Sequence, residues 1–507
     1  MVTAKPRKAK AVTEFGDFQT PAALALAATR VLCRLGIRPR SILEPTCGVG
    51  GFIRAAIACF PEAESITGVD INQDHLTTAD NGATGLHDHR VRLQQGDFFR
   101  VDWKSIVSTS GEPWLIIGNP PWVTSAELGS IESANLPEKS NFHGRMGIEA
   151  ITGKSNFDIS EWMLLRYLDW LEGHIGTIAV LCKTAVARKI LLHIWKKRVG
   201  MRSARMFKID ALSHFGAAVD ACFFVLEIEP NVNTFTCHIF DSLEAATPAQ
   251  EIGFLDGHII SDVAAFSLHR HLLGPEDRYV WRSGVKHDCS KVMELRTTPE
   301  GYQNGLHEIL SLEATFLFPM LKSSDIGNGR IECRGVMLVT QRLVGEGTDC
   351  IRTKAPMTWD YLQRHAALLE KRGSVIYKNK PAFSVFGVGP YTFAPWKVAI
   401  SGFYKKLRFV KIGPVNGKPV VLDDTIYFLP CWSEEEAGFV QDLLRSETAQ
   451  AFFKSMIHWD EKRPITVEIL KRLSIRKLAE SLGRDDEYSR FTESGDRGTP
   501  VPLASLP

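Results

Sequence analysis

Short apolar strands alternate with helices through the first half of the chain, and this alternation limits the possible folds more than any other feature. Strands that alternate with helices form a parallel sheet covered by helices on both faces. We therefore expect an α/β domain with a doubly wound, seven-stranded sheet of the Rossmann-like kind. The predicted strands span 41–43, 65–69, 91–94, 114–117, 177–181, 205–209 and 221–228, the last two as a closing hairpin. The predicted helices span 22–35, 52–60, 73–81, 159–171 and 186–199, with Thr20 as the first N-cap and Pro21 as the first helical residue.

The chain has 507 residues, which suffices for two to four domains of roughly 100–200 residues each. We expect a disordered tail over residues 1–12, the α/β domain over 13–240 and a linker over 241–250. A second domain is expected over 251–480 and a flexible tail over 481–507. Because regular alternation fades after residue 229, the second domain is predicted to be mixed α+β.

Composition excludes several classes of protein. Hydrophobic residues make up 44% of the chain and charged residues 23%, which argues against global disorder and a coiled-coil rod. The sequence contains no run of about 18 apolar residues, so we expect no membrane-spanning helix. The basic N-terminus lacks the apolar core of a secretory signal. The ten cysteines form no Cys-x-x-Cys pair, which disfavours structural zinc and fits a reducing cytoplasm. With a net charge of +2, a nucleic-acid surface would require local sorting of charge.

A glycine-rich turn joins the first predicted strand to the next helix. It contains Glu44, Thr46, Gly48 and Gly50. Glycines there let the backbone turn sharply and approach a ligand closely. The glycines are more closely spaced than in the pattern Gly-x-Gly-x-x-Gly, and the acid before them would repel a pyrophosphate. A carboxylate suits an ammonium or sulfonium group, so the turn favours S-adenosylmethionine over NAD.

Acidic residues follow the next two strands. Asp70 ends the second strand about 20 residues after the turn, where a doubly wound fold binds ribose hydroxyls. Asp97 follows the third strand and is expected to accept from an adenine amino group, while Phe98 packs on the ring. The alternative for either acid is a solvated strand end.

The sharpest signal is a buried strand at 114–117 that runs into Gly118-Asn119-Pro120-Pro121-Trp122. Here the sequence resembles the amino-group methyltransferases that modify adenine N6. The resemblance covers roughly residues 15–226, with Phe18-Gln19-Thr20-Pro21 as the leading cofactor motif and the elements above in consistent order. A leading cofactor motif and a long C-terminal half are typical of the gamma group of DNA adenine methyltransferases.

The chemistry of an amino group explains these residue types. The exocyclic nitrogen of adenine is a poor nucleophile, because its lone pair is delocalised into the ring. The Asn119 side-chain oxygen and the Pro120 carbonyl are expected to accept from its two N–H groups, which directs the lone pair toward a sulfonium methyl. Pro120 and Pro121 fix the backbone, so that orientation and electrostatics, without a covalent intermediate, carry the rate.

A target base inside a duplex must be flipped out before it can enter such a pocket. Trp122 is expected to offer a flat face for stacking. The alternative is a rigid turn with a core tryptophan. The resemblance suggests Phe215 as the second wall of the base slot and Phe157 as an aromatic that packs on the cofactor adenine. The alternative for Phe157 is a core position beside an N-cap at Asp158.

Other residue groups have simpler explanations. The pairs His87/His89 and His269/His271 lack a third metal ligand nearby in the sequence, so we expect no metal site. Cys47 has no paired catalytic partner in the sequence, which favours a packing role over a nucleophile.

Two stretches of the C-terminal half combine aromatic, basic and glycine residues, at 281–288 and 383–409. Arg463-Pro464 and Lys471-Arg472 are expected to add to a basic face. Such mixtures suit phosphate and base-edge contacts, although solvated charge explains any single residue. The stretches resemble the target-recognition regions of type II modification methyltransferases.

The sequence thus predicts a site-specific DNA adenine-N6 methyltransferase that uses S-adenosylmethionine, binds double-stranded DNA and protects it in a restriction–modification or phage-defence system. The chain is expected in the bacterial or archaeal cytoplasm, and a separate cognate endonuclease would supply restriction if restriction exists. The alternatives are methylation of an RNA adenine or a protein glutamine, and a non-catalytic DNA-binding subunit.

Overall fold

The computed structural model describes residues 19–81, 88–108, 111–123, 158–276, 278–459, 461 and 463–493. The chain divides into two compact units, Met1–Asp262 and Val263–Pro507. The expected tail over residues 1–12 lies outside the described residues.

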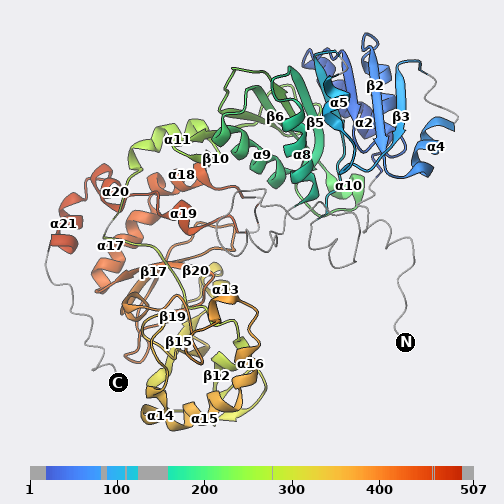
Figure 1. The fold of residues 1–507 in the computed structure, drawn as a ribbon. Coiled ribbons are helices and arrows are strands. Elements are labelled where there is room, and N and C mark those ends of the chain that lie inside the picture. The colour runs from blue at the N-terminus through green and yellow to red at the C-terminus, as the bar shows by residue number, and fades with distance from the viewer. Residues whose placement is uncertain are drawn as a thin grey trace. The chain divides into compact units, whose positions relative to one another are not determined.

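The first unit is built on one sheet with the strand order β10-β9-β8-β6-β7-β5-β4-β1-β2-β3 (Figure 1). Its strands are β1 (Ser41–Glu44), β2 (Ser65–Asp70), β3 (Val91–Gln95), β4 (Trp114–Gly118), β5 (Gly176–Lys183), β6 (Met201–Ile209), β7 (Ala221–Ile228), β8 (Thr236–Phe240), β9 (Gln250–Leu255) and β10 (His258–Ile260). Its helices are α2 (Ala22–Arg34), α3 (Gly51–Cys59), α4 (Gln73–Asn81), α5 (Trp103–Ser108), α8 (Ile159–Trp170), α9 (Thr184–Lys197) and α10 (Ala211–Phe215).

Strands β1 to β5 pair in parallel, and β7 is inserted antiparallel between β5 and β6. The predicted doubly wound sheet of seven strands and its closing hairpin are therefore confirmed. Three further strands, β8, β9 and β10, extend the sheet beyond β6. The segment 241–250, expected to be a linker, instead connects β8 to β9 within this sheet and supplies the first residue of β9. Strands β8, β9 and β10 were not predicted from the sequence, because they do not alternate with helices.

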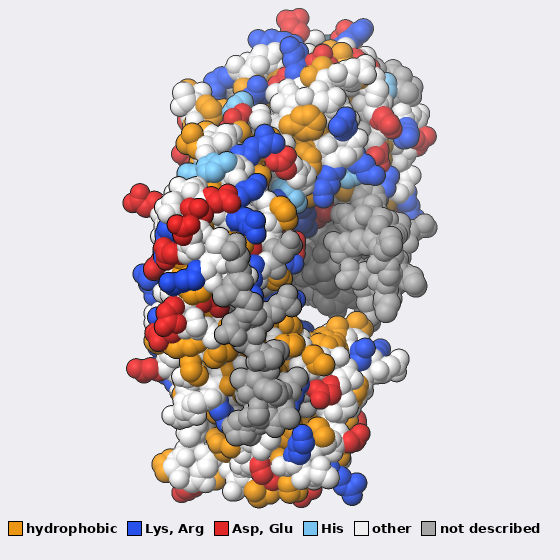
Figure 2. All heavy atoms as spheres, turned by 90° about the vertical axis from the view of Figure 1, so that its left-hand side faces the viewer, with side chains coloured by type: hydrophobic (Ala, Val, Ile, Leu, Met, Phe, Trp, Pro, Cys, Tyr) orange, Lys and Arg blue, Asp and Glu red, His pale blue; other side chains and the backbone are white. Residues whose placement is uncertain are grey.

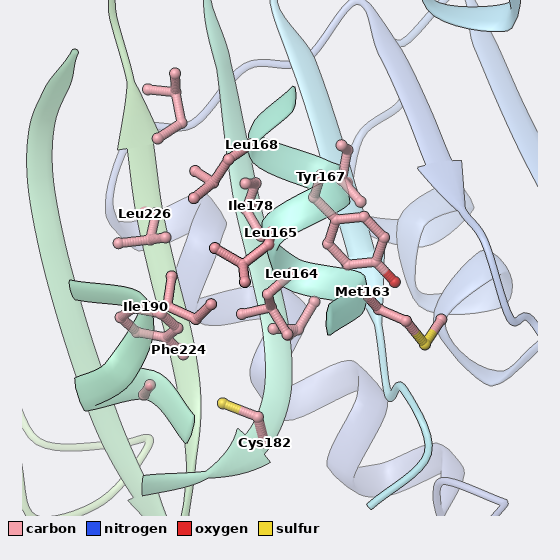
Figure 3. Packing of buried hydrophobic residues seen from close by; sticks show 14 of the residues in the cluster. Met163, Leu164, Leu165, Tyr167, Leu168, Ile178, Cys182, Ile190, Phe224 and Leu226 are labelled. Atoms are coloured by element: carbon pink, nitrogen blue, oxygen red, sulfur yellow. The ribbon is translucent and has the colours of Figure 1, made fainter. Parts of the chain in front are cut away.

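Side chains of the central strands alternate between two cores, as the period of a strand requires. In β4, Ile116 packs on one face, whereas Leu115 and Ile117 pack on the other. Helices α8 and α9 cover the first face, and Figure 3 shows Leu164 and Leu165 of α8 in the same apolar cluster as Ile178 of β5. Helices α2 and α3 cover the opposite face. Burial on both faces explains why these strands are almost entirely apolar.

Two helix starts in this unit bear on the site. Helix α2 begins at Ala22 with Pro21, not Thr20, as its N-cap, one residue later than predicted, and this N-cap makes no side-chain capping bond. The Pro21 carbonyl accepts from the Ala25 N–H at 3.0 Å, which places Pro21 just before the first turn. Helix α8 has Asp158 as N-cap, accepting from the Ser160 N–H, which was the alternative considered for this segment.

The second unit is mixed α+β, as predicted. It has a six-stranded sheet of order β14-β13-β12-β16-β15-β19 and a four-stranded sheet of order β11-β20-β17-β18. The strands are β11 (Arg282–Ser283), β12 (Glu294–Thr298), β13 (Gly301–Gln303), β14 (Ile309–Leu310), β15 (Leu317–Leu321), β16 (Gly335–Leu338), β17 (Trp396–Ser401), β18 (Val410–Ile412), β19 (Val421–Leu422) and β20 (Ile426–Cys431). The helices are α11 (Val263–His269), α12 (Ser290–Met293), α13 (Ser323–Gly327), α14 (Cys350–Lys354), α15 (Pro356–Arg364), α16 (Ala366–Glu370), α17 (Glu434–Arg445), α18 (Glu447–Met456), α19 (Val467–Leu470), α20 (Ile475–Ser481) and α21 (Asp485–Glu493).

The last described helix, α21, falls where a flexible tail was expected. Tyr488 is buried, and its hydroxyl lies 3.1 Å from Glu276, which anchors the helix. In the part of the chain that the structure describes, no helix combines the length and the apolar character that crossing a membrane needs.

We expect Leu164→Ala to lower the free energy of unfolding by about 2–5 kcal/mol, because it leaves a void in a fully buried layer between α8 and β5. Chemical denaturation followed by circular dichroism measures the change. Leu212→Ala is the control, since Leu212 is 62% exposed and its loss should change stability by less than about 0.5 kcal/mol. Equal effects of the two variants would contradict this description of the core.

Candidate functional site

A cavity of about 410 Å³ opens where strands β1 to β4 end. That size lies in the range of pockets that bind cofactors. Its lining comes from the end of each strand and from the chain just before α2. The lining residues are Gln19, Thr20, Glu44, Pro45, Thr46, Cys47, Gly48, Gly51, Phe52, Asp70, Ile71, Asn72, His75, Gly96, Asp97, Phe98, Phe99, Asn119, Pro121, Val123, Ile159 and Met163.

The glycine-rich turn is held in place by Asp70. Its Oδ2 accepts from the Gly48 N–H at 2.8 Å, and its Oδ1 accepts from the Asn72 N–H at 2.8 Å. Gly48 and Gly50 have φ angles of +50° and +79°, which side chains with a Cβ rarely adopt. Asp70 therefore fixes the turn as well as facing the cavity, a role that the sequence analysis did not predict.

Gln19 braces the same turn from outside. Its Oε1 accepts from the Val49 N–H at 3.1 Å. A Cβ on Gly48 would lie only 2.5 Å from that Gln19 oxygen, so the glutamine packs directly where a larger residue would project. The leading segment before α2 thus contributes to the cavity wall, together with Thr20.

Glu44 is a buried carboxyl group at the end of β1. Desolvation by burial raises the pKa of Glu44 well above its usual value, and the nearby Asp70 adds to this effect, although a hydrogen bond from the Ile53 backbone and the Arg54 cation lower it. Its Oε2 has no hydrogen-bond partner among the described residues. A buried carboxylate without full compensation is costly. A cationic ligand group in the cavity would stabilise its charged form.

Asp97 and Phe98 line the far wall of the cavity. The Asp97 carboxylate accepts from the Phe99 N–H at 2.9 Å and lies 3.4 Å from Arg100, which sets the turn after β3. The Phe98 ring contacts Trp103, among other aromatic side chains, at a centroid distance of 5.3 Å. Phe98 is therefore both a core residue and a cavity residue.

Strand β4 delivers Asn119 and Pro121 to the cavity. Gly118, directly before them, has a φ of +155°, and a Cβ there would lie 3.4 Å from the Glu44 Cγ. The backbone at the end of β4 therefore passes close to the carboxyl group that ends β1. Asn119 and Glu44 consequently belong to one pocket.

Trp122 is more deeply buried than the sequence analysis anticipated. Its Nε1–H donates to the Leu181 carbonyl at 3.2 Å, and 7% of the residue is exposed. Its ring meets Phe215 edge to face, with centroids 5.2 Å apart and planes at 70°. A base cannot lie between two rings in that contact, so the expected slot is closed in this structure.

A partly buried ion pair holds the Trp122 backbone. Lys183, the last residue of β5, donates to the Trp122 carbonyl at 2.9 Å and to Asp158 Oδ2 at 2.7 Å. Asp158 Oδ1 accepts from the backbone and hydroxyl of Ser160, so both carboxylate oxygens are used. The end of β4, the end of β5 and the start of α8 are tied together at this point.

The structure thus gathers most of the predicted residues around one cavity: Thr20, Glu44, Thr46, Gly48, Asp70, Asp97, Phe98, Asn119 and Pro121. Among the described residues, the predicted Pro21, Gly50, Pro120, Trp122 and Phe215 do not line it. Phe157 and His87 lie outside the described residues. Burial raises the pKa of the Cys47 thiol far above its usual value, which agrees with a packing role.

Sequence reasoning missed several residues of this region. Ile159 and Met163 of α8 line the cavity, as do Val123 and His75. Apolar residues on a buried helix give no sign of which ones face a ligand. Lys183 offered a signal that was overlooked, because a cation at the carboxyl end of an apolar central strand needs a partner.

Comparisons with known proteins were made for both sequence and structure. The chain is 45% identical to the type II methyltransferase M.NspV of Nostoc sp. (strain ATCC 29411 / PCC 7524) over 471 residues, which cover 93% of this chain and 98% of that protein. No protein-family profile matches.

Among solved structures, similarity extends to the type IIL restriction-modification enzyme MmeI in complex with DNA, with 11% identity, a TM-score of 0.45 and coverage of 98% of this chain and 74% of that one. It also extends to the methyltransferase subunit of a type I restriction-modification system from Streptococcus thermophilus, with 15% identity, a TM-score of 0.28 and coverage of 44% and 47%.

We expect the affinity for S-adenosylmethionine to rise with pH as Glu44 loses its proton. Because the pKa of Glu44 is raised, this rise should occur at a higher pH than for an ordinary glutamate, while the ammonium of the ligand is still charged. Glu44→Gln should bind more weakly at high pH and lose this pH dependence. Isothermal titration calorimetry across the pH range measures both effects; an unchanged pH profile in the variant would contradict the assignment.

Proposed function

This chain belongs to the type II methyltransferases, and from that premise we propose that it methylates the N6 amino group of a flipped-out adenine in double-stranded DNA. The methyl donor is S-adenosylmethionine, as expected from the sequence. It supplies an electrophilic methyl group on a positively charged sulfur. The remaining question is how the residues of this chain hold the two reactants.

The cavity suits the methyl donor. Glu44 presents an uncompensated carboxyl oxygen that would hold a cationic group of the donor. We assign the ribose hydroxyls to Asp70 and the adenine amino group to Asp97, with Phe98 against the ring. Each carboxylate already accepts backbone N–H bonds and has remaining lone pairs for a ligand.

One observation carries the proposal: Asn119 lines the same cavity as Glu44, Asp70 and Asp97. An amide oxygen at that place accepts an N–H of the target amino group beside the methyl donor. We assign the second N–H to the Pro120 carbonyl. The two acceptors orient the nitrogen lone pair, and the C–S bond breaks as the N–C bond forms, after which the amino group releases a proton. Fixed dipoles and proximity account for the rate.

The target base reaches this cavity only after leaving its duplex. In the proposal it stacks on Trp122. Because Phe215 now covers that ring edge on, base entry requires the Phe215 ring to move away. Stacking contributes roughly 1–3 kcal/mol per base, which offsets part of the cost of flipping.

The biological role that we propose is protection of host DNA in a restriction–modification or phage-defence system, with a separate cognate endonuclease. Such an enzyme must reach the chromosome, which places it in the cytoplasm. The alternative substrates are an RNA adenine and a protein glutamine. The second unit, 245 residues from Val263 to Pro507, favours DNA, because enzymes that methylate an RNA adenine or a protein glutamine usually need only a small added domain.

We expect Asn119→Ala to bind S-adenosylmethionine nearly as well as the unchanged protein and to transfer methyl groups at least about 100-fold more slowly, because one acceptor of the amino group is lost. Calorimetry gives the affinity and tritium transfer to duplex DNA gives the rate. Unchanged turnover would refute the role of Asn119. Label found only in RNA or protein would refute the DNA substrate.

We expect Lys183→Met to slow transfer by about tenfold or more with little change in cofactor affinity, because Lys183 contacts the Trp122 carbonyl but does not line the cavity. It acts as a positioning residue. Lys183→Arg, which keeps a cation beside Asp158, should restore part of the rate. Single-turnover kinetics and a thermal melt separate this effect from simple unfolding; a rate that falls only in proportion to lost folded protein would contradict it.

A further inference from the structure

A second hollow, of about 520 Å³, lies on the six-stranded sheet of the Val263–Pro507 unit. Its floor is one row of residues across four strands. Strand pairing places Gln303 opposite Arg296, Arg296 opposite Gly335, and Gly335 opposite Met320. All four line the hollow, and they share one face of the sheet.

Gly335 keeps the middle of this row low. A Cβ at that position would lie 2.5 Å from the Leu295 carbonyl oxygen, so no larger residue fits without a shift of the backbone. The side chains of Arg296 and Met320 therefore flank an open place on the sheet. This depression is a built feature of the strand pairing.

The rim of the hollow is rich in exposed cations. They come from the start of α12, the residues after β15 and the segment that leads into β16, and they adjoin Arg296 of the floor and His307. The basic lining residues are Lys291, Arg296, His307, Lys322, Arg330 and Arg334, against the acidic Glu294 and Asp325.

The two carboxylates are already neutralised. Glu294 pairs with Lys322 and lies 3.3 Å from His287, and Asp325 lies 3.4 Å from Arg330. Within the described ranges, no carboxylate forms an ion pair with Lys291, Arg296 or Arg334. The hollow therefore carries an excess of positive charge.

This excess of positive charge differs from the charge distribution on the face of the molecule that Figure 2 draws. On the face in Figure 2, Lys and Arg side chains are interspersed with Asp and Glu, as expected from the balanced composition of the chain. A protein with a net charge close to zero can bind a polyanion where its positive side chains gather in one hollow of the surface.

The floor also carries side chains, Arg296 and Gln303, that can form hydrogen bonds with base edges. The Gln303 amide makes no hydrogen bond to any described residue, whereas the neighbouring Asn304 is fully engaged with Glu308 and Tyr361. Arginine and glutamine form paired hydrogen bonds with the major-groove edges of guanine and adenine. Among the lining residues only Leu295 and Met320 are large and apolar, which is unlike a pocket for a small ligand.

We infer that this hollow is a contact surface for duplex DNA, with Lys291 and Arg334 on phosphates and Arg296 and Gln303 at base edges. The inference rests on the proposed function for its choice of nucleic acid. Phosphate contacts set affinity and its salt dependence, whereas base contacts set which sequences are preferred. The two pairs of residues therefore have separable effects.

The first test uses Lys291→Ala/Arg334→Ala in the full chain with a random 30-base-pair duplex. Anisotropy titrations should show affinity lower by about tenfold or more, and a salt slope reduced by about 2, since each lost phosphate contact removes about 0.9. Arg352→Ala/Lys354→Ala removes two exposed cations outside the hollow and should change neither quantity. Calorimetry with S-adenosylmethionine should show that all three proteins keep their cofactor site.

The second test uses Arg296→Ala and Gln303→Ala, with N6-methyladenine mapped across the host genome. Each variant should methylate a broader or altered set of sites. The inference would be overturned if Lys291→Ala/Arg334→Ala bound the duplex with the same affinity and salt slope as the unchanged protein. It would also be overturned if the unchanged protein preferred single-stranded RNA to duplex DNA. If neither the unchanged protein nor its variants methylate DNA, but Lys291→Ala/Arg334→Ala still loses duplex binding, the proposed function fails. The inference that the hollow contacts duplex DNA is then still supported.

Discussion

Parallel pairing of β1 with β2 on one side and β4 on the other is the constraint on which the site depends. The register places Leu43 beside Thr67 and Ile116, so all three strands end at one edge of the sheet. Glu44, Asp70 and Asn119 are separated widely in the sequence, yet they meet there because each ends or follows one of these strands. In open α/β sheets this edge is where ligands bind. The apolar strands are therefore as necessary to the site as the polar residues at their ends.

The polar residues at this edge hold one another before any ligand arrives. Asp70 fixes Gly48, Gln19 fixes Val49, and Lys183 fixes the carbonyl of Trp122. A site whose donors and acceptors are already oriented has little reorganisation left to undergo when a reaction proceeds. Glu44 is the exception, because its buried oxygen keeps its hydrogen-bonding capacity unused among the described residues. A cationic ligand group in the cavity would therefore stabilise the charged form of Glu44.

Much of the first unit could be predicted because local and long-range signals agree there. Apolar strands with acidic or amide residues at their ends predicted both the sheet and most of the cavity wall. The extension by β8, β9 and β10 could not be predicted, since antiparallel additions to an edge need no alternating helices. The burial of Trp122 entered only as the less favoured alternative of a core tryptophan, because a sequence does not tell which acceptor satisfies an indole N–H. The row of Gln303, Arg296 and Gly335 depends on strand register, which short strands in irregular sequence do not reveal.

The position of Trp122 joins these points. An indole inside a protein needs an acceptor for its N–H, and the Leu181 carbonyl on β5 provides one. The same strand ends in Lys183, which donates to the Trp122 carbonyl, so both the ring and the backbone of Trp122 are hydrogen-bonded to β5. The ring can then offer a face only by exchanging the edge of Phe215 for another aromatic surface. A purine supplies such a surface, whereas water does not. Under the proposed function, the closed contact would keep the apolar ring covered until a base replaces Phe215, while Lys183 of β5 holds the Trp122 carbonyl in place.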